Sequence, residues 1–172
     1  MPRAPQNTRP NPDDTSLTRR YVFVLLDDFT LLSFAGAVDA LRLANRQLGR
    51  KACTWIVIGE SGTRATCSAG TEIILDGGLG ELKHSDTVIV CGGEDVQSHT
   101  TKPLISWLRR EARRGVAMGA FCTGAHALAE AGLLDGKRAT IHWENYDGFS
   151  EDFPEVDLAR SVYVIDGNRM TT

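Results

Sequence analysis

Cys122 is the side chain of this sequence with the clearest setting for chemistry. It follows the small apolar run of residues 116–121 and is flanked, two positions away on either side, by Ala120 and Gly124. A nucleophile on a sharp strand-to-helix turn needs small neighbours, because the turn strains the backbone and leaves no room for bulk. The next residues are rich in helix formers up to Gly132, so Cys122 would lie at a helix N-terminus, which favours a thiolate or a bound anion. The alternative is a buried structural cysteine in a tight turn.

His142 is the candidate proton shuttle for such a cysteine. It follows Cys122 by twenty positions and lies in the stretch 139–143, which comes after an Asp-Gly turn and is typical of a short strand. Cysteine chemistry requires a thiolate, a group that moves protons and a site that holds a negatively charged oxygen. The pattern therefore predicts that Cys122 and His142 face one cavity.

A glycine pair after a buried strand predicts the third component, an oxyanion site. Residues 86–91 form an apolar run that ends in Gly92 and Gly93. Glycine amides approach a ligand oxygen closely, and the amide of Thr123 at the helix start would face the same oxygen. The amides of Gly93 and Thr123 would equally suit a bound carboxylate.

The order of these features resembles the ThiJ/PfpI superfamily, which shares the class I glutamine amidotransferase-like fold. Within it, residues 121–143 are similar to the N-terminal sensor domain of AraC-type transcription regulators, and residues 38–45 resemble the first helix of that branch. The resemblance covers residues 20–172. It implies an α/β domain with a doubly wound, mainly parallel, flavodoxin-like sheet and helices on both faces.

The resemblance also bears on whether the site is catalytic. Active members of the superfamily place an acidic side chain from the early helix against the cysteine, and the matching position here holds Ser33. No acid occurs in residues 29–38, and the glutamate of an amidotransferase-like triad would be Glu144, a weak candidate on an expected loop. We therefore expect Cys122 and His142 to be relics of catalysis and Ser33 to belong to a ligand pocket.

The apolar segments agree with a doubly wound sheet. Continuous apolar runs, typical of strands covered on both faces, occupy residues 21–26, 55–58, 87–91 and 116–121. Helical spacing extends over residues 31–48 and 103–114, and shorter strands are expected at 72–75, 162–166 and 169–172. On the helix after the elbow, His126 is expected to face solvent. Residues 1–19, rich in proline and polar residues, predict a disordered tail before the domain of residues 20–172.

Composition narrows the classes of function. A chain of 172 residues suits one domain, and a net charge of −3 does not favour a nucleic-acid surface. The arginines of residues 109–114 are expected to form a solvated helix face. The four cysteines lack metal-ligand spacing, so we expect reduced thiols in the cytoplasm and no metal or cofactor. No secretory signal and no run long enough to span a membrane is present in the sequence.

These observations favour a sensor domain of an AraC-type regulator. The sequence stops at Thr172 inside an expected strand, so we expect a longer chain that binds DNA through a C-terminal helix-turn-helix domain and forms a homodimer. The alternatives are a stand-alone cysteine enzyme that acts on a small carbonyl, isocyanide or amide, and a scaffold without a ligand.

The expected effector is a small amino acid or methylated amine. The resemblance contributes to this expectation, because related regulators control the catabolism of arginine, carnitine and glycine betaine. Trp143 offers an aromatic face for a cationic nitrogen, although core packing would explain it equally well. Asp27 or Asp28, after the first strand, would add a counter-charge, while Gly93 and Thr123 would hold a carboxylate.

Overall fold

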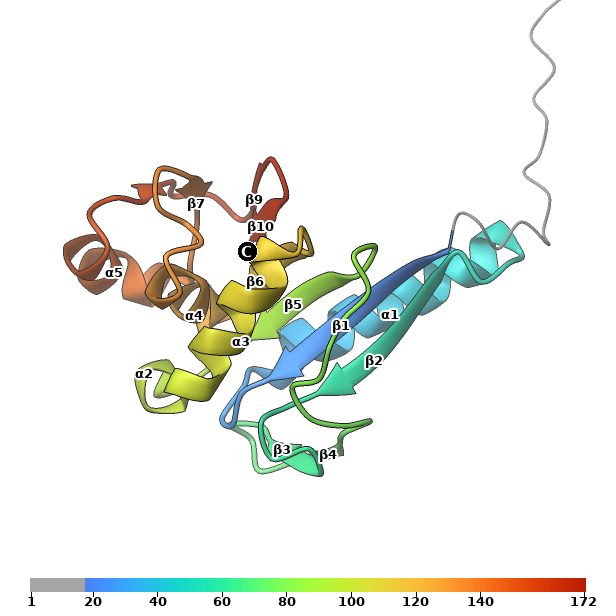
Figure 1. Cartoon of the computed structure of the whole chain (residues 1–172). Coiled ribbons are helices and arrows are strands. Elements are labelled where there is room, and N and C mark those ends of the chain that lie inside the picture. The colour runs from blue at the N-terminus through green and yellow to red at the C-terminus, as the bar shows by residue number, and fades with distance from the viewer. Residues whose placement is uncertain (1–17) are drawn as a thin grey trace, which may run out of the picture.

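A computed structural model describes residues 18–172. Its centre is a six-stranded sheet in the order β2-β1-β5-β6-β10-β9 (Figure 1). The strands are β1 (Arg19–Leu25), β2 (Cys53–Ile58), β5 (Thr87–Cys91), β6 (Ala117–Phe121), β9 (Val164–Asp166) and β10 (Arg169–Thr171). Two short pairs lie outside it, β3 (Arg64–Thr66) with β4 (Glu72–Ile74) and β7 (Arg138–Ala139) with β8 (Asp157–Leu158). Neighbouring strands of the sheet are parallel except β10 and β9, which confirms the predicted mainly parallel fold.

The expected N-terminal tail falls largely outside the described residues. Of residues 1–19, the structure describes only the last two, and β1 begins at Arg19, one residue before the predicted start of order. The first element of the described residues is therefore β1.

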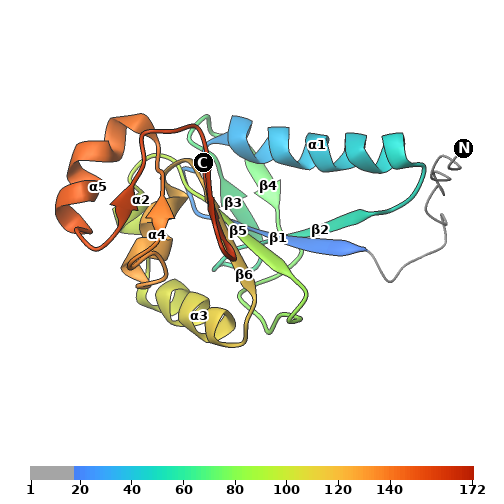
Figure 2. The ribbon, with the colours of Figure 1, turned by 90° about the horizontal axis from the view of Figure 1, so that it is seen from above.

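Helices cover both faces of the sheet (Figure 2). The long helix α1 (Leu31–Leu48) lies along one face, and α3 (Lys102–Arg113) and α4 (Ala125–Glu130) lie on the other. Two shorter helices, α2 (Val96–His99) and α5 (Tyr146–Asp152), complete the fold. In residues 18–172, no helix combines the length and the apolar character that a bilayer crossing requires.

Alternate residues of β1 enter two different cores. Val22 and Val24 pack in the core that contains α3 and α4, whereas Phe23 and Leu25 pack against Phe34 of α1. Both sets of side chains are almost completely buried. This double coverage explains why the strand is apolar at every position from Val22 to Leu25 and does not alternate with polar residues there.

The segment after α4 differs from the prediction. The strand expected at residues 139–143 is only two residues long, because β7 ends at Ala139. The next residue, Thr140, is fully buried, and its N–H donates a hydrogen bond of 2.8 Å to Thr171 Oγ1. A side chain thus takes the place of a strand partner, and the strand pairing ends here.

The arginines of α3 lie on an exposed helix face, as expected, and one of them also makes a tertiary contact. Arg109 donates to the carbonyl oxygens of Glu130 and Ala131 at the end of α4. Glu111 is fully buried, and its carboxylate accepts a hydrogen bond from the Leu82 N–H. These contacts tie α3 to α4 and to the loop before β5.

Asp86, at the start of β5, is the buried charge that fastens β1 at this end of the sheet. Its carboxylate is 0% exposed and accepts hydrogen bonds from Arg20 Nε (2.8 Å) and from the Lys83 N–H (2.8 Å). Burial by itself would raise the pKa of Asp86, but the hydrogen bonds and the charge of Arg20 outweigh it and lower that pKa.

We expect Asp86→Asn to lower the free energy of unfolding by about 1–3 kcal/mol at pH 7, because Arg20 loses its charged partner. The folded pKa is depressed, so the carboxylate's contribution is complete above the unfolded pKa of about 3.9 and is lost as the pH falls through the folded value. Denaturant unfolding measures both effects. As the control, Asp39→Asn breaks an exposed pair with Arg42 and should cost about 0.5 kcal/mol or less. Equal losses in the two variants would contradict this assignment.

Candidate functional site

The turn after β6 holds Cys122 in a strained backbone conformation. Its φ is 56°, in the left-handed region that non-glycine residues seldom adopt. β6 ends at Phe121, a single 3₁₀ turn covers Cys122–Gly124, and α4 follows directly. This geometry is a strand-to-helix elbow of the kind that presents a nucleophile, and strain of this kind clusters at functional sites.

Glycines allow the elbow to approach the end of β5. A Cβ atom on either Gly92 or Gly124 would collide with backbone atoms of the other turn or of Val90. The two turns are also joined by a hydrogen bond of 2.7 Å, which Thr123 Oγ1 donates to the Gly93 carbonyl oxygen. The predicted neighbours Gly93, Thr123 and Cys122 are therefore brought together by backbone packing.

Thr30 is the side chain that contacts the Cys122 sulfur. Its Oγ1 lies 3.3 Å from Cys122 Sγ, and it makes no capping hydrogen bond although it occupies the N-cap of α1. Ser33, the position predicted from the resemblance, contacts Thr30 instead of the sulfur. Its Oγ donates a hydrogen bond to the Thr30 carbonyl oxygen. A neutral hydroxyl thus occupies the place beside the sulfur. The Thr30 N–H donates to the Gly92 carbonyl oxygen, a contact between distant turns that no sequence spacing reveals.

Cys91 differs from Cys122 in its access to ligands. It is fully buried, and burial, with a smaller effect of the nearby Cys122, raises the pKa of its thiol. Cys122 is only partly buried and lines a cavity. Of these two neighbouring thiols, Cys122 is therefore the one that is accessible from the cavity.

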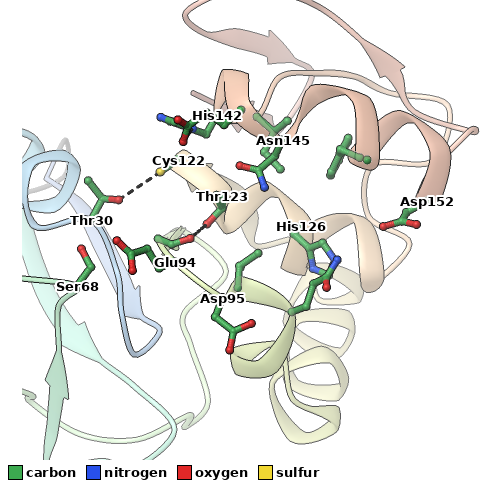
Figure 3. Close-up of a pocket in the computed structure, with 17 residues that line it drawn as sticks. Thr30, Ser68, Glu94, Asp95, Cys122, Thr123, His126, His142, Asn145 and Asp152 are labelled. Carbon is green, nitrogen blue, oxygen red and sulfur yellow. Dashed lines mark hydrogen bonds and ion pairs between the residues drawn. The ribbon is translucent and has the colours of Figure 1, made fainter.

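An open pocket of about 610 Å³ lies beside the elbow, at the carboxyl ends of β1, β5 and β6 (Figure 3). Ligands bind at this edge in open α/β sheets. The pocket is lined by Thr30, Ser68, Gly93, Glu94, Asp95, Val96, Gln97, Cys122, Thr123, His126, Ile141, His142, Glu144, Asn145, Gly148, Phe149 and Asp152.

Four of the predicted site residues belong to this lining and three do not. Cys122, Thr123, Gly93 and His142 face the pocket, whereas Ser33, Asp28 and Trp143 lie outside it. Asp28 adopts a φ of 58° and its Oδ2 lies 3.1 Å from His99 Nε2, so its carboxylate is directed toward α2. Trp143 is 68% exposed and packs beside the His142 ring, so it is neither a wall of the pocket nor part of the core.

Acidic side chains give the pocket its charge. Glu94, Asp95, Glu144 and Asp152 belong to the lining, which contains no lysine or arginine. Glu144 Oε2 lies 3.6 Å from His142 Nδ1. Within residues 18–172 no hydrogen bond joins His142 to Cys122, and no group of three potential ligands is arranged to hold a metal ion. The arrangement suits a positively charged molecule better than an anion.

His126 is the pocket residue that the sequence interpretation placed incorrectly. Its ring packs edge-on against Phe153 at 5.2 Å, and it lines the pocket, whereas a solvent-facing position was expected. Its Nδ1 is buried and has no hydrogen-bond partner among residues 18–172. Burial lowers the pKa of His126, and the charges of Glu130 and Asp152 offset this only partly. The spacing of four residues from Cys122, which places both on one helical face, was the available signal.

We expect His126 to make folding less favourable in acid. Its folded pKa lies below the unfolded value of about 6.5, so the unfolded chain binds protons first, and stability falls as the pH drops through the unfolded value toward the folded one. His126→Phe keeps the ring against Phe153 and should flatten this part of the stability–pH curve. His84→Asn, at an exposed histidine, should leave the curve unchanged. An NMR titration that gives His126 a pKa above 6.5 would overturn the assignment.

Proteins with known roles resemble this chain along most of its length. The transcriptional regulator GbdR of Pseudomonas aeruginosa is 42% identical over 150 residues, which are 87% of this chain and 41% of the regulator. The regulator CdhR of the same organism is 38% identical over 156 residues, 91% of this chain and 46% of the regulator. Both are named as regulators of the helix-turn-helix type. The chain thus spans less than half the length of these relatives.

A shorter match connects the chain to an enzyme. The isonitrile hydratase of Pseudomonas putida is 36% identical over 63 residues, which are 36% of this chain and 28% of the hydratase. The match covers too little of either protein to carry the hydratase activity to this chain.

Solved structures and the family model agree on the fold. The crystal structure of an AraC family transcriptional regulator from Pseudomonas putida superposes with a TM-score of 0.77 at 29% identity, over 90% of this chain and 83% of that one. The model of the DJ-1/PfpI family matches residues 19–172. The chain therefore belongs to the DJ-1/PfpI family.

Proposed function

We propose that this domain is the ligand-sensing part of a transcription regulator, and that the pocket beside Cys122 binds the effector. The observation that carries the proposal is the neutral contact at the elbow. Thr30 Oγ1 occupies the place beside the sulfur where an enzyme needs an acid or a base, while the pocket itself is large enough for a metabolite. The similarity to two helix-turn-helix regulators supports the same role.

We infer that the effector is a small metabolite with a positively charged nitrogen, such as an amino acid or a methylated amine. The four carboxylates of the lining supply the counter-charge that was expected from Asp28. The backbone of Gly93 and Thr123 at the elbow provides amides for a carboxylate at the opposite end of a zwitterion. Phe149, which is buried in the lining, is better placed than Trp143 to contact the apolar part of such a molecule.

The regulator as a whole would bind DNA through a separate C-terminal helix-turn-helix domain, as a dimer. The names of the relatives support a helix-turn-helix domain, and a two-fold dimer would suit paired half-sites. Within α3, Arg109 donates hydrogen bonds to backbone carbonyl oxygens at the end of α4, which gives it a structural role.

A cysteine hydratase is the second candidate, and the match to isonitrile hydratase favours it. Its chemistry would need His142 or Glu144 to take a proton from Cys122. His142 is paired instead with Glu144, and the hydrogen-bond partner of the sulfur is Thr30. This geometry supports binding over turnover.

We expect a panel of amino acids, betaines and carnitine to contain a compound that stabilises the domain. At a concentration 100 times its Kd, a ligand that binds only the folded state adds about 2.7 kcal/mol. A thermal-shift assay measures this, and Phe149→Ala should abolish the shift, because Phe149 packs in the lining. Stabilisation by sugars or aromatic acids, with none by the amines, would reject this class of effector.

We expect no steady-state hydration of isocyanides and no hydrolysis of small amides, because the thiol lacks a hydrogen-bonded base. The wild-type domain is compared with Cys122→Ser in a substrate-depletion assay over several hours. Alkylation of Cys122 by iodoacetamide does not count as turnover, since it consumes the thiol once. Multiple turnovers that disappear in Cys122→Ser would support the hydratase and reject the sensor.

A further inference from the structure

The acids of the pocket are distributed along its whole length. Figure 3 shows Glu94 near Cys122, on the side of Thr30 and Ser68, and Asp152 near His126 at the other end. The side-chain amide of Asn145 points into the space between them. A bound molecule therefore meets hydrogen-bond acceptors at both ends of the pocket.

A second hollow continues the pocket beyond Asp152. It has a volume of about 400 Å³, shares Gln97, His126 and Asp152 with the main pocket, and adds the carboxylate of Glu130. Asp152 thus lies at the junction of two connected spaces. A cationic group placed there would be close to two carboxylates, and neither lining contains a lysine or an arginine that would pair with them.

Aromatic rings are scarce in the same lining. Phe149 is the one phenyl ring of the main pocket among the described residues, and Phe153, whose ring centroid lies 5.0 Å from that of Phe149, lines the second hollow. Trp143 points away, and the ring of Tyr146 is covered by the Arg160 guanidinium at 5.5 Å. Proteins that select quaternary ammonium groups surround them with several aromatic faces. Two phenyl rings that pack against each other, Phe149 and Phe153, do not form such a cage among the described residues.

The two kinds of cation would interact with this lining in different ways. A primary or secondary ammonium, or a guanidinium, donates N–H hydrogen bonds to carboxylates, and charge-assisted bonds of this type are the strong ones. A quaternary ammonium has no N–H. It would remove water from Asp152 and Asn145 without replacing the hydrogen bonds that the water made, which is unfavourable.

We propose that the effector carries its positive charge on a nitrogen that bears hydrogens, and that this nitrogen binds at Asp152. This inference rests on the proposed function, and it narrows the effector class to ammonium or guanidinium compounds at the expense of the fully methylated ones. The acceptors at Asp152 and Asn145, together with the absence of an aromatic cage, carry the inference.

The test compares molecules that differ only in methylation of the nitrogen. Titration calorimetry with the intact domain uses glycine, sarcosine, dimethylglycine and glycine betaine, then 4-aminobutyrate and lysine, each beside its trimethylated form. We expect at least one N–H compound to bind about tenfold or more tightly than its trimethylated partner. Equal or tighter binding of the trimethylated forms would overturn the inference and leave the proposed function in place. If no compound of either kind binds, the proposed effector class fails as well.

A pair of variants locates the nitrogen. Asp152→Asn should weaken binding of the best N–H compound by about tenfold or more, because a charged hydrogen bond is lost. Glu151→Gln removes the same charge from the neighbouring position, outside the pocket, and should leave the affinity unchanged. Equal losses in both variants would indicate a general effect of charge and would contradict binding at Asp152. Since both side chains are exposed, both variants are expected to fold, which their unfolding curves verify.

Discussion

The close approach of two backbone turns positions every other part of this site. The turn after β5, with Gly92 and Gly93, touches the turn after β6, with Thr123 and Gly124, at a distance that leaves no space for a Cβ atom. The hydrogen bond from Thr123 Oγ1 to the Gly93 carbonyl oxygen fastens the pair. Strain at Cys122 is sustained by this packing, because relaxing its φ would separate the two turns.

The glycine turn after β5 also binds the segment that follows β1, and this segment supplies the neighbour of the cysteine sulfur. Residues 28–30 pair with the glycine turn through two backbone hydrogen bonds. The Thr30 N–H donates to the Gly92 carbonyl oxygen, and the Glu94 N–H donates to the Asp28 carbonyl oxygen. This pairing places the Thr30 side chain beside the cysteine sulfur. A hydroxyl neither removes a proton from the thiol nor carries charge at neutral pH. An elbow that would present a nucleophile in an enzyme is thereby supported by a neutral neighbour and opens into an acidic pocket.

The sequence predicted the sheet more accurately than the site. The main strands and α1 follow from apolar runs and from helical spacing, which are properties of short stretches of the sequence. The helix predicted over residues 31–48 is α1, with the same bounds. Cys122 at the elbow and the glycine turn were also predictable, because small residues mark the close contact. The partner of the sulfur was not. Ser33 was aligned by counting along a helix, but the backbone at Thr30 turns just before that helix and directs Thr30 to the sulfur.

Other differences have similar causes. Asp28 points away because its left-handed backbone turns its carboxylate toward His99, and a single sequence does not reveal such a conformation. The wall that holds His142, Asn145 and Asp152 depends on Thr140, whose hydrogen bond to Thr171 ends the expected strand. The acidic character of the pocket arises where residues 94–95 meet residues 144–152 in space, far apart in the chain.

The rate at which iodoacetamide alkylates Cys122 tests most directly whether the elbow is the binding site. The reaction is followed by mass spectrometry on the peptide that contains Cys122, with and without a saturating amine that stabilises the domain. If the amine occupies the pocket, it covers the sulfur, and alkylation should slow in proportion to occupancy while modification of Cys53, which lies outside the pocket, keeps its rate. An unchanged rate at Cys122 under full saturation would place the ligand elsewhere and contradict the account.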